Sequence, residues 1–206
     1  CSEKYSREPF YTYRGCVRSS HYYREGLINL KGQKVCEAKY ENLSGLSTER
    51  ILFTKNLEWG VLDRSGKVVL EPCYGGLQRY SEGLAAATVR CWRGDFSRPY
   101  PSSWGFIDER GKLVIPHRYV AARAFHDGFA LVSQSLPEKS RSGKSFVEGF
   151  IDKTGRMCFE SNFAHSMDFN HGVAVKSKGT DKSEPSDCRA RLCLINIKGE
   201  ELTKTG

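Results

Sequence analysis

The sequence predicts an all-β repeat protein, and three observations support this fold class. A short segment that ends in glycine recurs five times along the 206 residues. Glycine (20 residues) and tyrosine plus phenylalanine (21 residues) are abundant, whereas methionine occurs twice, which disfavours an all-helical fold. No apolar run approaches the ~18 residues of a membrane-spanning helix. We therefore expect one continuous β domain over residues 10–206, with about five units.

Each recurring segment predicts a β-hairpin. Two apolar residues lead into Asp or Asn, two mostly polar residues follow, and Gly closes the turn. The Asp or Asn side chain accepts hydrogen bonds from the backbone ahead of it, and Gly supplies the positive φ of the turn. The turn glycines are 34, 45, 44 and 44 residues apart. The five segments are residues 26–32, 60–66, 105–111, 149–155 and 193–199.

A crossover and a third strand complete the unit after each of the first four hairpins. An aromatic residue follows the turn glycine by eight positions in these four units: Tyr40, Tyr74, Tyr119 and Phe163. A short apolar run then predicts a third strand, at residues 51–53, 84–86, 129–131 and 173–175. The unit is therefore a hairpin, an aromatic-bearing crossover and a third strand, with a period of about 44 residues.

The two ends of the array are incomplete in a complementary way. The last hairpin has no third strand, whereas residues 10–17 resemble a third strand without its hairpin. Pairing these two ends would protect the sheet edges that otherwise invite aggregation. We therefore expect a closed, propeller-like ring. The alternative is an open β-solenoid, which stacks the same unit.

Two central segments resemble the bacterial WG-repeat family, which is also called the KWG-repeat family. They begin at Trp59-Gly60 and Trp104-Gly105, and the similarity extends through Tyr119 and residues 80–86. The resemblance covers about residues 24–202. Three units depart from the Trp-Gly pair and are read as diverged or capping units: Glu25-Gly26, Glu148-Gly149 and Leu192-Cys193. The resemblance implies a β-rich binding repeat that is frequent in secreted or envelope-associated bacterial proteins and has no general catalytic motif.

The eight cysteines point to an oxidising compartment, although none forms a CxxC pair. Cys188 and Cys193 are close enough to form a disulfide across one loop, and the pairing of the other six stays open. Cys1 stands where a mature bacterial lipoprotein carries its lipid, with residues 1–9 as a tether. We expect a periplasmic or outer-membrane lipoprotein, or otherwise a secreted protein. The alternatives are free thiols in a cytosolic protein and an arbitrary boundary at Cys1.

The sequence offers no catalytic, metal or cofactor site. Asp63, Asp108 and Asp152 occupy the turn position that Asn29 and Asn196 share, so they are expected to shape turns. The five histidines have no metal-binding spacing, and no nucleophile, phosphate-loop or dinucleotide motif occurs. We therefore expect a protein that is not an enzyme and has no cofactor. Trp59 and Trp104 hold the same position in their units, which indicates a recurring core position.

Three insertions between units are the candidate binding region. Residues 88–104, 134–148 and 176–193 each join a third strand to the next hairpin, and equivalent loops of a repeat fold emerge on one face. They carry +2, +1 and +2, which is +5 of the net charge of +8. Trp92, flanked by arginines, is a candidate anchor. The predicted binding residues are Arg90, Trp92, Arg93, Arg98, Arg141, Lys144, Arg189 and Arg191.

This charge predicts an acidic protein partner, bound by a monomer through its basic loops. A specific version is a periplasmic immunity protein whose loops block the active cleft of a secreted toxin. Nucleic acid is disfavoured because the basic residues stand singly, separated by acids. The alternative is a lipoprotein that binds a glycan or an anionic cell-wall polymer through Trp92, Tyr100 and Phe146.

Overall fold

A computed structural model describes residues 10–16, 23–45, 49–89, 103–136, 146–161, 166–177 and 192–202. These ranges contain β-strands and no helix, which confirms the all-β class. None of their segments is a helix that could cross a membrane. The strands are β1 (Tyr11–Cys16), β2 (Tyr23–Ile28), β3 (Lys34–Tyr40), β4 (Asn42–Ser44), β5 (Ile51–Lys55), β6 (Glu58–Leu62), β7 (Val68–Leu77), β8 (Leu84–Val89), β9 (Trp104–Asp108), β10 (Leu113–Ala122), β11 (Ala130–Ser135), β12 (Phe146–Ile151), β13 (Met157–Glu160), β14 (Val173–Ser177) and β15 (Leu192–Asn196).

All described strand pairs are antiparallel and join strands that are consecutive in the sequence, but β3 does not pair with β4, nor β13 with β14. The strands form a three-stranded sheet of β1 to β3, a ten-stranded sheet of β4 to β13, and a two-stranded sheet of β14 and β15. The ten-stranded sheet does not stay flat. Register shifts within β7 and β10 let the first part of each strand pair with its own hairpin and the second part with the next strand. Such bulges bend a strand and re-aim its two halves.

The packing unit of the fold is a third strand together with the hairpin that follows it. β5 pairs with β6, β8 with β9, and β11 with β12, so each third strand joins the hairpin of the next unit. β1 likewise pairs with β2 over six residues, from Tyr11↔Ile28 to Cys16↔Tyr23. Among the described residues, the predicted pairing of residues 10–17 with the last hairpin is not seen. The shorter connection to the adjacent hairpin costs less chain entropy.

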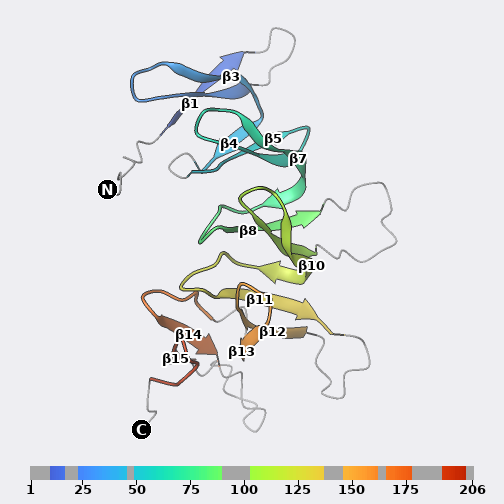
Figure 1. The fold of residues 1–206 in the computed structure, drawn as a ribbon, viewed down its shortest axis with the longest axis vertical. Coiled ribbons are helices and arrows are strands. Elements are labelled where there is room, and N and C mark those ends of the chain that lie inside the picture. Colours follow the sequence, from blue (N-terminus) through green and yellow to red (C-terminus); the bar gives the residue numbers. More distant parts are fainter. Residues whose placement is uncertain are drawn as a thin grey trace, which may run out of the picture.

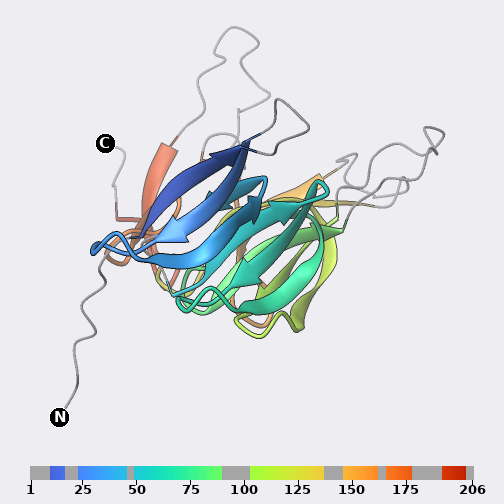
Figure 2. The ribbon, with the colours of Figure 1, turned by 90° about the horizontal axis from the view of Figure 1, so that it is seen from above.

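The described strands thus form five layers, which we number from the N-terminus. Layer 1 is β1 to β3, layer 2 is built on β5 and β6, layer 3 on β8 and β9, and layer 4 on β11 and β12. Layer 5 is β14 with β15. Figure 1 shows the layers stacked along the long axis, with β1 to β3 at one end of the stack and β14 and β15 at the other. Figure 2, which looks along that axis, shows successive layers overlapping and rotated relative to one another.

A hydrophobic core lies between each pair of successive layers. Leu27 and Tyr40 meet Ile51, Phe53 and Leu62 between layers 1 and 2. The other three described cores repeat this arrangement at the following junctions. An interior layer therefore buries both faces, which explains why third strands such as Leu84-Ala85-Ala86-Ala87 are continuously apolar.

The first and last strands of the stack lie in different sheets. β1 lies in the first sheet and β15 in the last, and the described strands contain no pairing between them. The described part of the molecule therefore does not confirm the closed ring. It does confirm a repeat of β-hairpins with crossovers. Of the four crossover aromatics, Tyr40 and Tyr119 are buried, Tyr74 is half-buried, and Phe163 lies outside the described residues.

Candidate functional site

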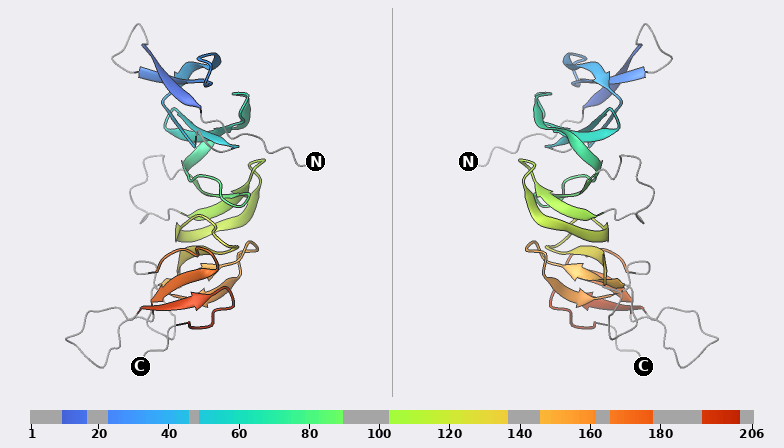
Figure 3. Two further views of the ribbon diagram at one scale, coloured as in Figure 1. Left: turned by 90° about the vertical axis from the view of Figure 1, so that its left-hand side faces the viewer. Right: turned by 90° about the vertical axis from the view of Figure 1, so that its right-hand side faces the viewer.

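Strand pairing places the connections of each layer at two opposite edges. Leu84, at the start of a third strand, pairs with Asp108 beside the hairpin turn, so the crossover tips and hairpin turns share one edge. We call it the turn edge. Thr88 pairs with Trp104 at the other end of the same strands, where residues 90–102 join β8 to β9. We call this the loop edge. Figure 3 shows the hairpin turns as a column along one side of the stack.

The loop edge is where the predicted insertions emerge. Ser135 pairs with Phe146, and Ser177 pairs with Leu192, at the strand ends that flank the second and third insertions. The same register relates these ends to Thr88 and Trp104. The eight predicted binding residues themselves, Arg90, Trp92, Arg93, Arg98, Arg141, Lys144, Arg189 and Arg191, lie outside the described residues.

Layer 2 closes its loop edge with a tight turn in place of an insertion. Asn56 and Leu57 both have positive φ, at 54° and 63°. Glu41 holds this turn: its Oε1 accepts the Asn56 N–H at 3.0 Å, and its Oε2 accepts the Leu57 N–H at 3.1 Å. The guanidinium of Arg24 lies 2.9 Å from Glu41 and lowers the pKa of that carboxyl. The short 34-residue spacing of the first two turn glycines is the sequence signal for this missing insertion.

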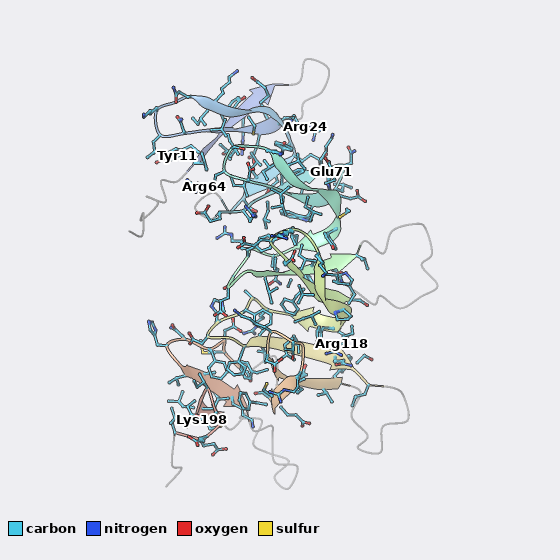
Figure 4. The ribbon with its side chains drawn as sticks, viewed as in Figure 1. Tyr11, Arg24, Arg64, Glu71, Arg118 and Lys198 are labelled. Carbon is cyan, nitrogen blue, oxygen red and sulfur yellow. The ribbon has the colours of Figure 1, made fainter. Side chains whose placement is uncertain are left out.

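The described side chains of the loop edge carry both charges. Figure 4 shows Arg24, Glu71 and Arg118 along one side of the stack, with Arg64 and Lys198 on the other. Next to Arg118, the ring of His117 lies 6.1 Å from that of Tyr74, and its Nδ1 lies 3.1 Å from the carbonyl oxygen of Ser103.

Trp59 and Trp104 belong to the cores of their layers. Both side chains are partly buried, and they pack against the cores that follow layers 2 and 3. This confirms the recurring core position. It leaves Trp92 in the first insertion, outside the described residues, as the candidate anchor.

The five Asp and Asn residues of the hairpin turns make the same hydrogen bonds. Asp63 Oδ1 accepts the N–H groups of Ser65 and Lys67 at 2.9 and 3.0 Å. Asn29, Asp108, Asp152 and Asn196 bond the equivalent amides at 2.9–3.1 Å. Burial opposes ionisation of Asp152, but hydrogen bonds from Thr154 and Arg156 outweigh it and lower its pKa to about 2. These carboxylates shape the hairpin turns, as predicted.

The thiols of the described residues are not arranged for covalent chemistry. Cys36, Cys73, Cys158 and Cys193 are free thiols, so the predicted disulfide between Cys188, which lies outside the described residues, and Cys193 is not seen. Burial raises the pKa of Cys36, Cys73 and Cys158, which disfavours the reactive thiolate. Cys193 is instead a small apolar side chain, 2% exposed, in the core before layer 5. In the described ranges no group of three metal-ligating side chains occurs.

Comparison with known proteins places the two central units in a family. The family described as "WG containing repeat" matches residues 59–90 and 104–135, which are the segments that begin at Trp59 and Trp104. No curated protein matches the chain.

Two solved structures match the chain at low sequence identity. The crystal structure of a eukaryotic initiation factor is 13% identical, with a TM-score of 0.53, over 95% of this chain and 52% of that one. A protein of unknown function from Bacteroides caccae is 14% identical, with a TM-score of 0.37, over 95% of this chain and 72% of that one. This chain therefore spans about half the length of the first protein, and at this identity the likeness concerns the fold alone.

Proposed function

We propose that this protein, two of whose units match the WG-containing repeat, is a binding protein of the bacterial envelope without enzymatic activity. Its partner is an acidic protein, recognised through the insertions of the loop edge. The specific form of the proposal is a periplasmic immunity protein that neutralises a secreted toxin by covering its active cleft. A lipid on Cys1 would attach it to the membrane.

One observation carries the proposal: the strand ends that flank all three basic insertions lie at the same edge of the stack. The equivalent pairs in successive layers are Thr88 with Trp104, Ser133 with Glu148, and Ser177 with Leu192. The insertions between them hold +5 of the net charge of +8. Basic loops that start from one edge of a rigid scaffold favour an acidic partner and speed its association.

The test is a charge reversal at the loop edge with a matched control at the turn edge. The loop variant replaces Arg93, Arg98, Arg141 and Lys144 by Glu. The control replaces Lys31, Lys67, Lys112 and Lys198 by Glu, which changes the net charge by the same amount on exposed hairpin-turn residues. Both proteins are used to capture partners from a periplasmic extract, at low and at high salt.

We expect the wild type and the control to capture the same acidic protein, with capture that weakens as salt rises. The loop variant should lose that protein. Equal capture by the loop variant, or equal loss by the control, contradicts the proposal, because binding would then not depend on where the charge lies.

A second candidate function is binding of a glycan or a cell-wall polymer. The observation that favours it is Phe146, whose side chain is 47% exposed at the loop-edge end of β12. Together with Trp92 and Tyr100 it would form a shallow aromatic groove. Titration with polymer should then quench tryptophan fluorescence in the wild type and not after Trp92→Phe. A polymer response with no protein captured would select this function over the first.

A further inference from the structure

The repeat register shows which side chains join successive layers. In the first strand of each hairpin, one residue faces the next layer: the residue directly after the glycine of the Trp-Gly pair, or after its equivalent. In the first four hairpins these residues are Leu27, Val61, Phe106 and Phe150, and each is 0% exposed. The equivalent residue of the last hairpin is Leu194, which is 37% exposed. The side chain that builds a core at every interior junction is therefore accessible at the C-terminal end of the stack.

The face around Leu194 is aliphatic. Leu192 alternates with it on the same side of β15 and is 53% exposed. Val175 pairs directly with Leu194 on β14 and is half-buried. Leu202, whose N–H donates to the carbonyl of Leu194 at 2.8 Å, is 50% exposed. The outer layer of a repeat protein usually carries polar side chains on such a face.

The N-terminal end of the stack presents the complementary half of a junction. In layer 2 the side chains that close the core against layer 1 are Ile51, Phe53 and Leu62, with exposures of 0%, 1% and 0%. The paired strands of layer 1 place Tyr11, Tyr13 and Ile28 at these positions. Tyr11 is 52% exposed, and the other two are half-buried.

The ring of Tyr13 also packs over its neighbouring glycine in the same way as the ring of Phe53. A Cβ added to Gly60 would lie 2.5 Å from the ring of Phe53, and one added to Gly26 would lie 2.5 Å from the ring of Tyr13. Tyr13 thus occupies the position of Phe53 over its glycine, with a hydroxyl that donates to Glu37 at 3.3 Å. A tyrosine suits a face that is wet in the free chain and buried in a complex, because its ring is apolar and its hydroxyl remains solvated.

We propose that the two ends of the stack bind each other between copies of this chain, head to tail. Layer 1 of one copy covers Leu192, Leu194 and Leu202 of another, as layer 2 covers Leu27 within the chain. Such a heterologous contact closes into a ring of copies or extends into a filament. The self-association departs from the monomer expected from the sequence. It uses neither the insertions nor the loop edge, so its test is independent of the test of the proposed function.

The test uses one variant at each end of the full chain. The N-end variant is Tyr11→Glu, and the C-end variant is Leu192→Glu with Leu202→Glu. All three replaced side chains are at least 50% exposed, so folding should tolerate the changes, and thermal unfolding of each variant checks this. The matched control is Leu113→Glu, an apolar residue of an interior hairpin that is 40% exposed. Molar mass is measured by sedimentation equilibrium over a range of concentrations.

A head-to-tail contact predicts one pattern of masses. The wild type and the Leu113→Glu control should rise above the mass of one chain as concentration increases. Each end variant alone should stay at the mass of one chain. A mixture of the two variants should reach twice that mass, because the intact C-end of one binds the intact N-end of the other.

Other patterns overturn the proposal. A wild type that remains a single chain at every concentration shows that the ends do not bind. An N-end variant that still dimerises alone shows that like C-terminal faces pair, and a C-end variant that dimerises alone shows the same for N-terminal faces. Loss of association in the Leu113→Glu control would indicate non-specific hydrophobic contact.

Discussion

At the scale of single residues, the hairpin turns show how one side chain can determine a backbone conformation. Asp or Asn accepts two amides two and four residues ahead, and the glycine that follows has φ between 75° and 84° in all five turns. Either side chain works because the acceptor is a carbonyl or carboxylate oxygen in the same place. The two types differ in charge, and this difference gives a pH dependence.

Asp152 should contribute stability that acid removes. Its pKa is about 2 in the folded chain, against about 3.9 in an unfolded one. A carboxyl with a lowered pKa stabilises the fold above the unfolded value, and this contribution is lost as pH falls from about 4 to about 2. Urea unfolding should therefore show Asp152→Asn gaining stability relative to the wild type over that interval. Asn29 and Asn196 show that an amide supports the turn.

At neutral pH, alanine and asparagine variants of Asp152 distinguish the contribution of the turn hydrogen bonds to stability from that of the charge. Asp152→Ala should lower the free energy of unfolding by about 1 kcal/mol, because two backbone amides lose their acceptor. Asp152→Asn should lower it by less. If the alanine and asparagine variants are equally stable at pH 7, the side-chain acceptor does not stabilise the turn.

Glycine in the Trp-Gly pair is required by a close backbone approach. A Cβ added to Gly105 would lie 2.6 Å from the carbonyl oxygen of Ile115 and 2.9 Å from the N of His117, on the returning strand. At the last hairpin the equivalent residue is Cys193. The residues of that unit equivalent to Ile115 and His117 are 203 and 205, which lie outside the described residues.

Gly105→Ala should therefore destabilise the fold by about 3 kcal/mol through overpacking against backbone. The control is Gly128→Ala, where the added Cβ has nothing within 4 Å and only the φ of 84° is unfavourable, at about 1 kcal/mol. Urea unfolding at pH 7 measures both. A loss at Gly105 no larger than that at Gly128 would mean that the returning strand can move away.

At the scale of elements, the crossover tips join one unit to the next. Three tips have paired residues with positive φ, at 82–83, 127–128 and 171–172. Glu82 accepts the N–H of Gly128 at 3.0 Å, and Asp127 accepts the N–H of Gly172 at 2.7 Å. Glu82 also forms an ion pair of 3.0 Å with Lys153. Each carboxylate thus supports the turn of the following unit, about 45 residues away in the chain.

Removal of this carboxylate should loosen the next tip locally. Glu82→Ala should accelerate hydrogen exchange of the Gly128 amide about 5-fold, which corresponds to the ~1 kcal/mol of one lost hydrogen bond. The matched control is Glu37→Ala, which breaks an exposed ion pair with Lys34 on one strand and should leave exchange at Gly128 unchanged. Equal exchange in both variants would show that Glu82 does not hold the tip.

At the scale of the whole molecule, each layer packs only against its neighbours in the stack. A middle layer has a core on both faces, whereas layers 1 and 5 each have one described core. Layer 5 also has two described strands where the others have three. In such an array stability is a sum of layer and junction contributions. The ends should therefore open before the centre.

Hydrogen exchange of the dilute protein should show this gradient. Amides of β8, β9 and β11 should exchange most slowly, and those of β14 and β15 fastest. If the ends bind each other, exchange in β15 should slow at high concentration while that of β9 stays unchanged. Uniform protection along the chain would mean that the layers unfold as one cooperative unit.

The sequence by itself determined the β-hairpins, their turns, the aromatic core positions and the number of units. These features repeat at a fixed spacing and depend on local chemistry: an Asx acceptor, a glycine with positive φ, and apolar runs buried on both faces. The structure decided which strands pair. Residues 10–16 and the third strands pair with the hairpin that follows them, because the nearest partner closes the shortest loop. It also decided that Cys193 is a buried thiol and that Leu194 lies accessible at the end of the stack. Both depend on what stands beside a residue in space, which no spacing along the chain records.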